Sequence, residues 1–355
     1  MNDVIVIGGG QSGLAAARAL RETGLAPLIL EAGPEPVGSW PRYYDSLAVF
    51  SPAEYSGMPG APFPGAPERY PARDEVVAYL RQYAAGLDVD ISTCTPVAEV
   101  VDDTRGGFLV RTAGGEELPA AGVVAASGSF GNPHLPVLSG QSTFAGRLLH
   151  VADYRNPVPY AGQRIVVVGA GNSAVQVGHE LARVANVTLA TRHPLRFLPQ
   201  HLDGHDLHYW LKRTGFDDLP PEWLTGLAPS TLVLDTGDYA RAFEDGTLDQ
   251  RPMFTTFDGD DVVWSDGTRE RVDTVVFATG YRPHLDYLAR LGALEDGLPQ
   301  HSGGISTTHP GLVYLGLEYQ RSFSSNTLRG VHRDAEHVVG ALAAHVRDAG
   351  ALVRS

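Results

Sequence analysis

The sequence predicts an α/β protein with two parallel-sheet units, the second inserted into the first. The prediction rests on a pattern that occurs twice: a β-branched run, then glycines, then a helical run, then another short apolar run. The first copy starts at residues 4–7 and the second at residues 165–168. A strand, tight turn, helix and strand within about 30 residues form a βαβ unit, whose two strands are parallel.

Composition excludes several classes of protein. The chain has 355 residues, 43% of them hydrophobic, which is enough for two buried cores. Its formal net charge of −14 argues against nucleic acid and anionic membranes as partners, because both attract clustered Lys and Arg. No apolar run approaches the roughly 18 residues of a membrane span, and the start lacks a basic signal region, so we expect a soluble cytoplasmic protein. The one cysteine, Cys94, excludes a CxxC redox pair within the chain.

The order of the predicted elements places the domain boundaries. We expect a first, discontinuous domain at 1–157 and 278–355, and a second at 158–277 with a helical insertion at about 200–250. The hinge-like segment 155–159, with its two prolines, marks the first junction. The further expected elements are a helix from Asp74 to about Gly86, a β-meander at 97–101, 108–112 and 123–126, strands at 261–264, 274–277 and 312–316, and a helix at about 333–350.

The first glycine run has the pattern GxGxxG, at Gly8, Gly10 and Gly13, with Gln11 and Ser12 between the last two. In such a turn the first glycine permits the bend, the second lets the backbone approach a pyrophosphate, and the third lets the helix pack on the strand. The pyrophosphate would face the free N–H groups at the helix N-terminus. Glu31 closes the next strand, 23 residues after Gly8, at the position of an acid that binds ribose hydroxyls.

The second run reads GxGxxA, at Gly169, Gly171 and Ala174, with Asn172 and Ser173 between the last two. The residue 23 positions after Gly169 is Arg192. A carboxylate at this offset suits a free 2′-hydroxyl, whereas a guanidinium suits a 2′-phosphate through charge-assisted bonds. We therefore expect two Rossmann-like domains that bind different dinucleotides, FAD on the first loop and NADPH on the second. The alternative for Arg192 is a solvated surface arginine.

Four further segments point to one family. Residues 144–154 read FxGxxxHxxxY and include His150; Gly38 and Trp40 follow the ribose-binding acid. Gly128 ends the first expected crossing between the domains, and Thr279 and Gly280 lie in the second. Together these segments resemble the class B flavoprotein monooxygenases, in the form typical of flavin-containing monooxygenases. Segments 45–47, 50–52 and 324–333 are most similar to bacterial flavin monooxygenases of the arsenic-resistance (ArsO) type.

The resemblance implies a reaction. NADPH reduces FAD, the reduced flavin and O2 form a C4a-(hydro)peroxide, and one oxygen atom passes to a small nitrogen, sulfur or arsenic nucleophile or to a carbonyl. Phe50 stands where the family usually has an Asn beside the flavin, with Ser51 next to it, so both are candidate catalytic residues. His150 is a third candidate, and a hinge role is favoured for it over acid–base chemistry.

Two alternatives stay open. The missing Asn suggests an NADPH-dependent flavin reductase or oxidase without oxygen transfer, and the second alternative is a non-catalytic FAD/NADPH redox sensor. A metal site at His201, Asp203, His205 and His208 is not expected, because no second ligand pair has zinc-like spacing; a polar loop over the nicotinamide or substrate fits better. The expected partners are a small-molecule substrate and O2, and a homodimer is left open.

Overall fold

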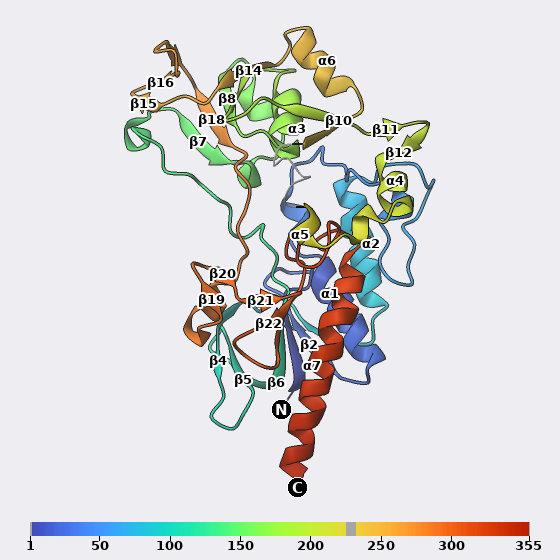
Figure 1. The fold of residues 1–355 in the computed structure, drawn as a ribbon. Helices are drawn as coiled ribbons and strands as arrows, with labels where there is room; N and C mark the ends of the chain where they lie inside the picture. Colours follow the sequence, from blue (N-terminus) through green and yellow to red (C-terminus); the bar gives the residue numbers. More distant parts are fainter. Residues whose placement is uncertain (1, 225–231, 355) are drawn as a thin grey trace.

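The computed structural model describes residues 2–224 and 232–354, which form two lobes joined by two crossings of the chain (Figure 1). Both chain ends belong to the first, lower lobe, and the second lobe is built from the middle of the sequence. The insertion of one unit into the other is therefore as the sequence predicts.

The first lobe is built on a nine-stranded mixed sheet in the order β21-β22-β23-β6-β1-β2-β3, with β4 and β5 attached through β6. The pairs of β1 with β2 and β6, of β2 with β3, and of β23 with β6 are parallel. Its strands are β1 (Asn2–Ile7), β2 (Pro27–Leu30), β3 (Asp90–Ser92), β4 (Val97–Asp102), β5 (Phe108–Thr112), β6 (Glu117–Ala125), β21 (His301–Ser302), β22 (Ile305–Ser306) and β23 (Leu312–Tyr314).

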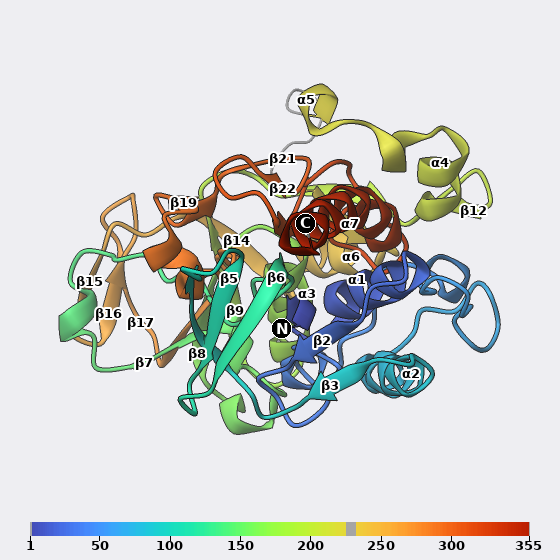
Figure 2. The ribbon, with the colours of Figure 1, turned by 90° about the horizontal axis from the view of Figure 1, so that it is seen from below.

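Alternate residues of β1 enter two different cores. Val4 and Val6 pack against the helices α1 (Gln11–Glu22), α2 (Arg73–Ala85) and α7 (Val331–Arg354), and α1 lies between the other two in Figure 2. Ile5 and Ile7 face the opposite side, where the antiparallel β4–β5 hairpin and the 3-10 helix η7 (Asp286–Leu291) cover the sheet. The period of two along the strand thus explains why the sheet has two apolar faces.

The second lobe contains a five-stranded, all-parallel sheet in the order β14-β9-β8-β18-β7. The strands are β7 (Arg147–His150), β8 (Arg164–Val168), β9 (Asn186–Thr191), β14 (Asp249–Pro252) and β18 (Thr274–Phe277). The helices α3 (Asn172–Leu181) and α6 (Asp238–Glu244) pack on one face. The other face is covered by the antiparallel strands β15 (Thr256–Asp258), β16 (Asp261–Val263) and β17 (Arg269–Arg271).

An excursion of the second lobe, residues 196–224, leaves its sheet and reaches the first lobe. It contains β10 (Arg196–Pro199), the hairpin of β11 (His201–Leu202) and β12 (His205–Asp206), α4 (Leu207–Arg213), the 3-10 helix η6 (Phe216–Asp218) and α5 (Pro221–Leu224); β10 pairs with β13 (Leu232–Asp235). A further small hairpin joins β19 (Leu294–Glu295) and β20 (Leu298–Pro299). These short helices lie in the segment of about 200–250 for which a helical insertion was expected; residues 225–231 of that segment lie outside the described residues.

Two expected boundaries differ from the structure. Residues 147–150 form β7 and pair in parallel with β18, so they belong to the second sheet although the boundary was expected at 157. Within the fingerprint segment, Leu149 is buried in the second lobe's core. Helix α2 starts at Arg73 rather than after an Asp74 cap, because the Glu75 carboxylate accepts a hydrogen bond from the Ala72 N–H at 2.9 Å.

Within the described residues, no helix combines the length and apolarity that a membrane crossing requires.

Candidate cofactor and active site

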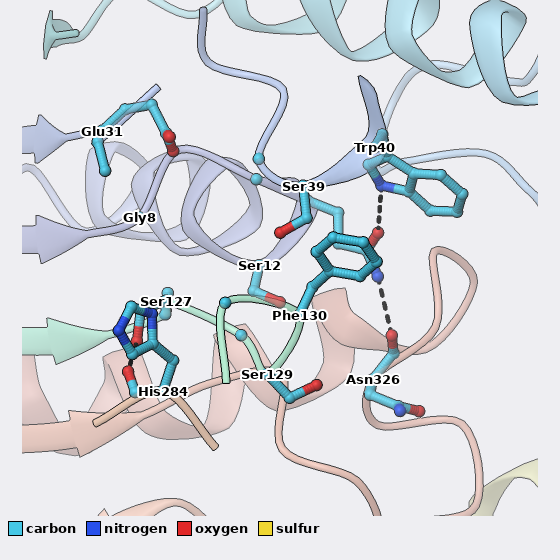
Figure 3. Close-up of a pocket in the computed structure, with 18 of the residues that line it drawn as sticks. Gly8, Ser12, Glu31, Ser39, Trp40, Ser127, Ser129, Phe130, His284 and Asn326 are labelled. Atoms are coloured by element: carbon cyan, nitrogen blue, oxygen red, sulfur yellow. Dashed lines mark hydrogen bonds between the residues drawn. The ribbon is translucent and has the colours of Figure 1, made fainter. Parts of the chain in front are cut away.

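A cavity of about 510 Å³ lies at the carboxyl ends of β1 and β2, where parallel sheets commonly bind ligands (Figure 3). The first glycine loop, the segment around Trp40, the end of β6 and the segment before α7 form its walls. Ten residues predicted from the sequence line it: Gly8, Gly10, Gln11, Ser12, Glu31, Gly38, Trp40, Phe50, Ser51 and Gly128.

The shape of the first loop depends on close backbone contacts. A Cβ atom on Gly13 would lie 1.8 Å from the carbonyl oxygen of Gly8, so only glycine lets α1 approach the strand end this closely. Gly38 has a φ of +60°, and a Cβ there would lie 2.8 Å from the Cα of Gly10. The backbone therefore forms a narrow cradle beside the N-terminus of α1, which fits the pyrophosphate of a dinucleotide such as FAD.

Glu31 fixes the adenosine-side end of this cradle. Its carboxylate, in a residue only 7% exposed, accepts hydrogen bonds from the N–H groups of Gly9 at 2.6 Å and Gly33 at 2.7 Å. Each carboxylate oxygen has a second lone pair, so the group retains acceptor capacity toward ribose hydroxyls.

A side-chain bridge joins three distant segments across the cavity (Figure 3). Trp40 donates from Nε1 to Oε1 of Gln11 at 3.0 Å, and Nε2 of Gln11 donates to the carbonyl of Asn326 at 2.8 Å. Gln11 was predicted only from its place in the glycine loop. The structure shows that its amide also holds the segment before α7 in place as a cavity wall.

Phe50 and Ser51 lie where the cavity meets the second lobe's excursion. The Phe50 side chain is 43% exposed and stacks on the His208 ring with centroids 5.8 Å apart, while its carbonyl accepts a hydrogen bond from Gln200 at 3.1 Å. Ser51 is buried, with its hydroxyl 2.9 Å from that of Ser56. The loop expected over the nicotinamide or substrate therefore contacts Phe50.

Asp206 holds this contact together. Its Oδ1 accepts from Nδ1 of His208 at 2.7 Å, and its Oδ2 accepts from Gln200 at 2.7 Å and from the Tyr70 hydroxyl at 2.5 Å. Burial alone would raise the pKa of Asp206, but these hydrogen bonds outweigh it and lower the pKa to about 2. The ionised carboxylate thus ties Tyr70 of the first lobe to the excursion.

Among the described residues, no three His, Cys, Asp or Glu side chains group as metal ligands.

His150, Thr279 and Gly280 lie at the crossing between the lobes and do not line the cavity. His150 is 1% exposed; its Nδ1 accepts from the Ala152 N–H at 3.1 Å, so its Nε2 carries the proton and donates to the Gly280 carbonyl at 3.1 Å. Burial lowers the pKa of His150, which keeps the ring neutral. Backbone groups engage both ring nitrogens, which fixes the ring at the crossing between the lobes.

The second glycine loop follows β8 and opens α3. Gly169 has a φ of +144°, and a Cβ there would lie 2.4 Å from the Ala278 carbonyl oxygen, whereas a Cβ on Gly171 would meet nothing within 4 Å. Ala174 is fully buried under the turn, and Asn172 accepts a hydrogen bond from the Leu234 N–H at 2.9 Å. The open space at Gly171 fits the approach of a nucleotide to the backbone.

Of the remaining predicted residues, Ser173 is half-buried in the first turn of α3, and Arg192 is exposed just after β9, at the carboxyl edge of the second sheet. Arg192 has no ion-pair partner within the described part of the chain. Both therefore lie on the side of the sheet where the second loop opens.

Sequence reasoning missed the aromatic wall and the far wall of the cavity. Phe130 packs between Tyr43, at 4.3 Å, and Tyr281, at 5.2 Å between ring centroids. Arg329 lines the cavity and pairs with Asp217 of the excursion through two hydrogen bonds of 2.9 and 2.8 Å. Tyr43 could have been identified from its position three residues after Trp40. No local sequence pattern indicates that Arg329 pairs with Asp217, because the two residues are 112 positions apart.

Comparisons with known proteins agree with this geometry. The family described as pyridine nucleotide-disulphide oxidoreductase matches residues 5–214. A flavin-containing monooxygenase of known structure from Stenotrophomonas maltophilia is 33% identical, covering 97% of this chain and 99% of its own with a TM-score of 0.85. The indole-3-pyruvate monooxygenase YUCCA1 of Oryza sativa subsp. japonica is 31% identical over 92% of this chain and 91% of its own. An uncharacterized CzcO-like oxidoreductase of Geobacillus kaustophilus is 29% identical over 97% of this chain.

These matches cover both lobes and both glycine loops. Enzymes of this kind use FAD and NADPH, the two cofactors expected from the loops. The chain therefore belongs to the pyridine nucleotide-disulphide oxidoreductase family and, within it, to the flavin monooxygenase-like enzymes of class B.

Proposed function

We propose that the chain is an NADPH-dependent monooxygenase that transfers one oxygen atom of O2 to a small nitrogen, sulfur or arsenic nucleophile or to a carbonyl. NADPH, a proton, O2 and the substrate are consumed, and NADP⁺, water and the oxygenated substrate are formed. The observation that carries the proposal is the contact of the two lobes at Phe50, a residue that lines the first lobe's cavity and whose ring and carbonyl are contacted by His208 and Gln200 of the second lobe. Bound FAD supplies the redox chemistry, accepting hydride and activating O2.

The residues of the chain bind, orient and shield. The first glycine loop and Glu31 hold the dinucleotide, and the bridge from Trp40 through Gln11 to Asn326 keeps the opposite wall in position. Phe50, stacked on His208, places an aromatic ring at the end of the cavity. No side chain needs to act as a nucleophile in this proposal.

The coenzyme preference rests on Arg192. Its exposed guanidinium lies after β9, with no ion-pair partner in the described residues, and suits a 2′-phosphate. We therefore propose NADPH rather than NADH as the reductant.

A reductase or oxidase is the second candidate, and one observation favours it: Phe50 supplies no amide where the family usually has an Asn. The monooxygenase and the reductase or oxidase are distinguished by one experiment. FAD-loaded protein is mixed with NADPH without air, and air is then admitted together with a thioether, an amine or trivalent arsenite. The proposal expects flavin reduction followed by oxygenated product. Reduction followed by hydrogen peroxide alone would identify an oxidase, and no reduction would identify a redox sensor.

A further inference from the structure

A second cavity of about 500 Å³ adjoins the first. Arg329 lines both, so the two cavities are neighbours across one side chain. The second is formed by the loop 54–62, the end of α4 and the start of α7. Its apolar lining comes from Tyr55, Met58, Ala61 and Pro62, and its charged or polar lining from Glu54, Lys212, Arg329 and His332.

The basic lining is unexpected for a chain with a net charge of −14. Lys212 is the only lysine in the sequence, and it lies in the last turn of α4 facing this cavity. It is exposed and has no hydrogen-bond or ion-pair partner in the described residues. Its charge is therefore available to a ligand.

Two further nitrogens have unused hydrogen-bonding capacity. Arg329 binds Asp217 through Nε and Nη2, whereas its Nη1 has no partner among the described residues and is not one of the fully buried atoms left unpaired there. Nδ1 of His332 is buried without a partner in the described chain. Glu54 is the single carboxylate that lines the cavity, and it lies at the exposed rim. The cavity therefore offers the ammonium of Lys212 and Nη1 of Arg329 as donors, with the Glu54 carboxylate at its rim.

An apolar wall beside the unpaired donors of Lys212 and Arg329 fits one chemical class of ligand. A carboxylate accepts several hydrogen bonds and is stabilised by an unpaired ammonium and a guanidinium edge. The side chains of Tyr55 and Met58 suit the apolar body attached to it.

We propose that the second cavity binds the carboxylate of the substrate, so that a small apolar carboxylic acid reaches the cofactor cavity past Arg329. The inference rests on the proposed function and names its substrate class. Lys212 provides the charge, Nη1 of Arg329 provides a hydrogen bond, and the reacting sulfur, nitrogen or carbonyl extends toward Phe50.

Binding of a redox-inert probe tests this without any oxygen transfer. Full-length, FAD-loaded protein is titrated calorimetrically with phenylpropanoate and with its neutral analogue phenylpropanol. The site predicts that the wild type binds the acid about tenfold or more tightly than the alcohol, and that Lys212→Met abolishes the difference. Lys212→Arg should retain most of it, and Glu54→Gln should strengthen binding of the acid. Arg213→Met, the exposed neighbour on α4 outside the cavity, should change neither affinity.

Equal binding of acid and alcohol by the wild type would overturn the proposal, as would a Lys212→Met variant that keeps the preference. If thioethers are still oxygenated in that case, the proposed monooxygenase function is retained and only the carboxylate site is excluded. Conversely, a preference for the acid that depends on Lys212, together with peroxide as the only product, would retain the site and remove the proposed function.

Discussion

A Cβ atom at Gly13 would lie 1.8 Å from the carbonyl oxygen of Gly8, whereas one at Gly171 would meet no heavy atom within 4 Å. The two glycines occupy comparable loops but face different demands: Gly13 is required by the fold, and Gly171 leaves room for a ligand. We expect Gly13→Ala to lower the melting temperature and to yield protein that retains little FAD. Gly171→Ala should melt with the wild type and retain FAD but bind NADPH more weakly.

Thermal unfolding, flavin absorbance and NADPH titration of the two purified variants check this contrast. If Gly171→Ala lost stability to the same degree as Gly13→Ala, the second loop would be packed by the protein itself, and the nucleotide would have to bind elsewhere.

We expect Arg192 to distinguish the two nicotinamide coenzymes. Loss of a charge-assisted contact to a 2′-phosphate weakens binding by roughly 10- to 150-fold. Arg192→Ala should therefore raise the KM for NADPH by about tenfold or more and leave that for NADH nearly unchanged. Steady-state rates of flavin reduction with each coenzyme measure both constants. An equal loss for both would show that Arg192 does not contact the phosphate.

We expect Phe50 to affect the reaction of the reduced flavin with O2. Its ring forms the end of the cavity and stacks on His208, so replacement by Asn removes apolar bulk and supplies an amide. Phe50→Asn should change the fraction of NADPH that yields oxygenated product more than it changes the anaerobic rate of flavin reduction, because hydride transfer precedes the reaction with O2. The ratio of product to hydrogen peroxide gives this fraction. A variant that alters reduction alone would place Phe50 away from the oxygen site.

Cavity-lining residues that belong to a local sequence pattern could be predicted. Contacts between residues far apart in the sequence could not. The glycine loop, Glu31 and Trp40 line the cavity as expected, because each follows a strand at a fixed offset. The second partner of Gln11, the Asn326 carbonyl, lies 315 residues away, and nothing local to either residue indicates it.

At the scale of elements, the excursion from β10 to α5 is attached to the first lobe by the buried pair of Asp217 and Arg329, whose side chains are 4% and 7% exposed. Removing one partner of a buried ion pair leaves an uncompensated charge and costs about 3–5 kcal/mol. Asp217→Asn should therefore lower the free energy of unfolding by an amount in this range.

The neighbouring pair of Asp218 and Arg333 supplies the control. Asp218 is largely exposed, so Asp218→Asn should cost only about 0–1 kcal/mol. Denaturant unfolding of the holoenzyme measures the free energy of unfolding of each variant. A cost for Asp217→Asn no larger than that for Asp218→Asn would show that the buried pair does not hold the excursion.

Most of the parallel strands were predictable, because fully buried strands are continuous apolar runs between glycines. Strand β7 was not: its four residues include Arg147 and His150 beside only two leucines, and its sheet membership depends on pairing with β18, more than 100 residues later. The start of α2 was misplaced by two residues, because the N-cap is Ala72 rather than Asp74.

At the scale of the whole molecule, two nucleotide-binding lobes meet at the end of one cavity. His150 and Thr279 hold the crossings by hydrogen bonds to backbone carbonyls of Gly280 and His134, and Asp206 joins Tyr70 to the excursion. In the proposed function, a reductant held by the second lobe reduces a flavin held by the first. We propose that the oxygen of the product then comes from O2.

Turnover of the FAD-loaded enzyme with NADPH and a carboxylate-bearing thioether under isotopically heavy O2 tests that claim most directly. Mass spectrometry of the product measures the label. We expect a sulfoxide that carries one heavy oxygen atom, formed with consumption of NADPH. An unlabelled sulfoxide, or NADPH consumption that yields labelled hydrogen peroxide and unchanged thioether, would contradict it.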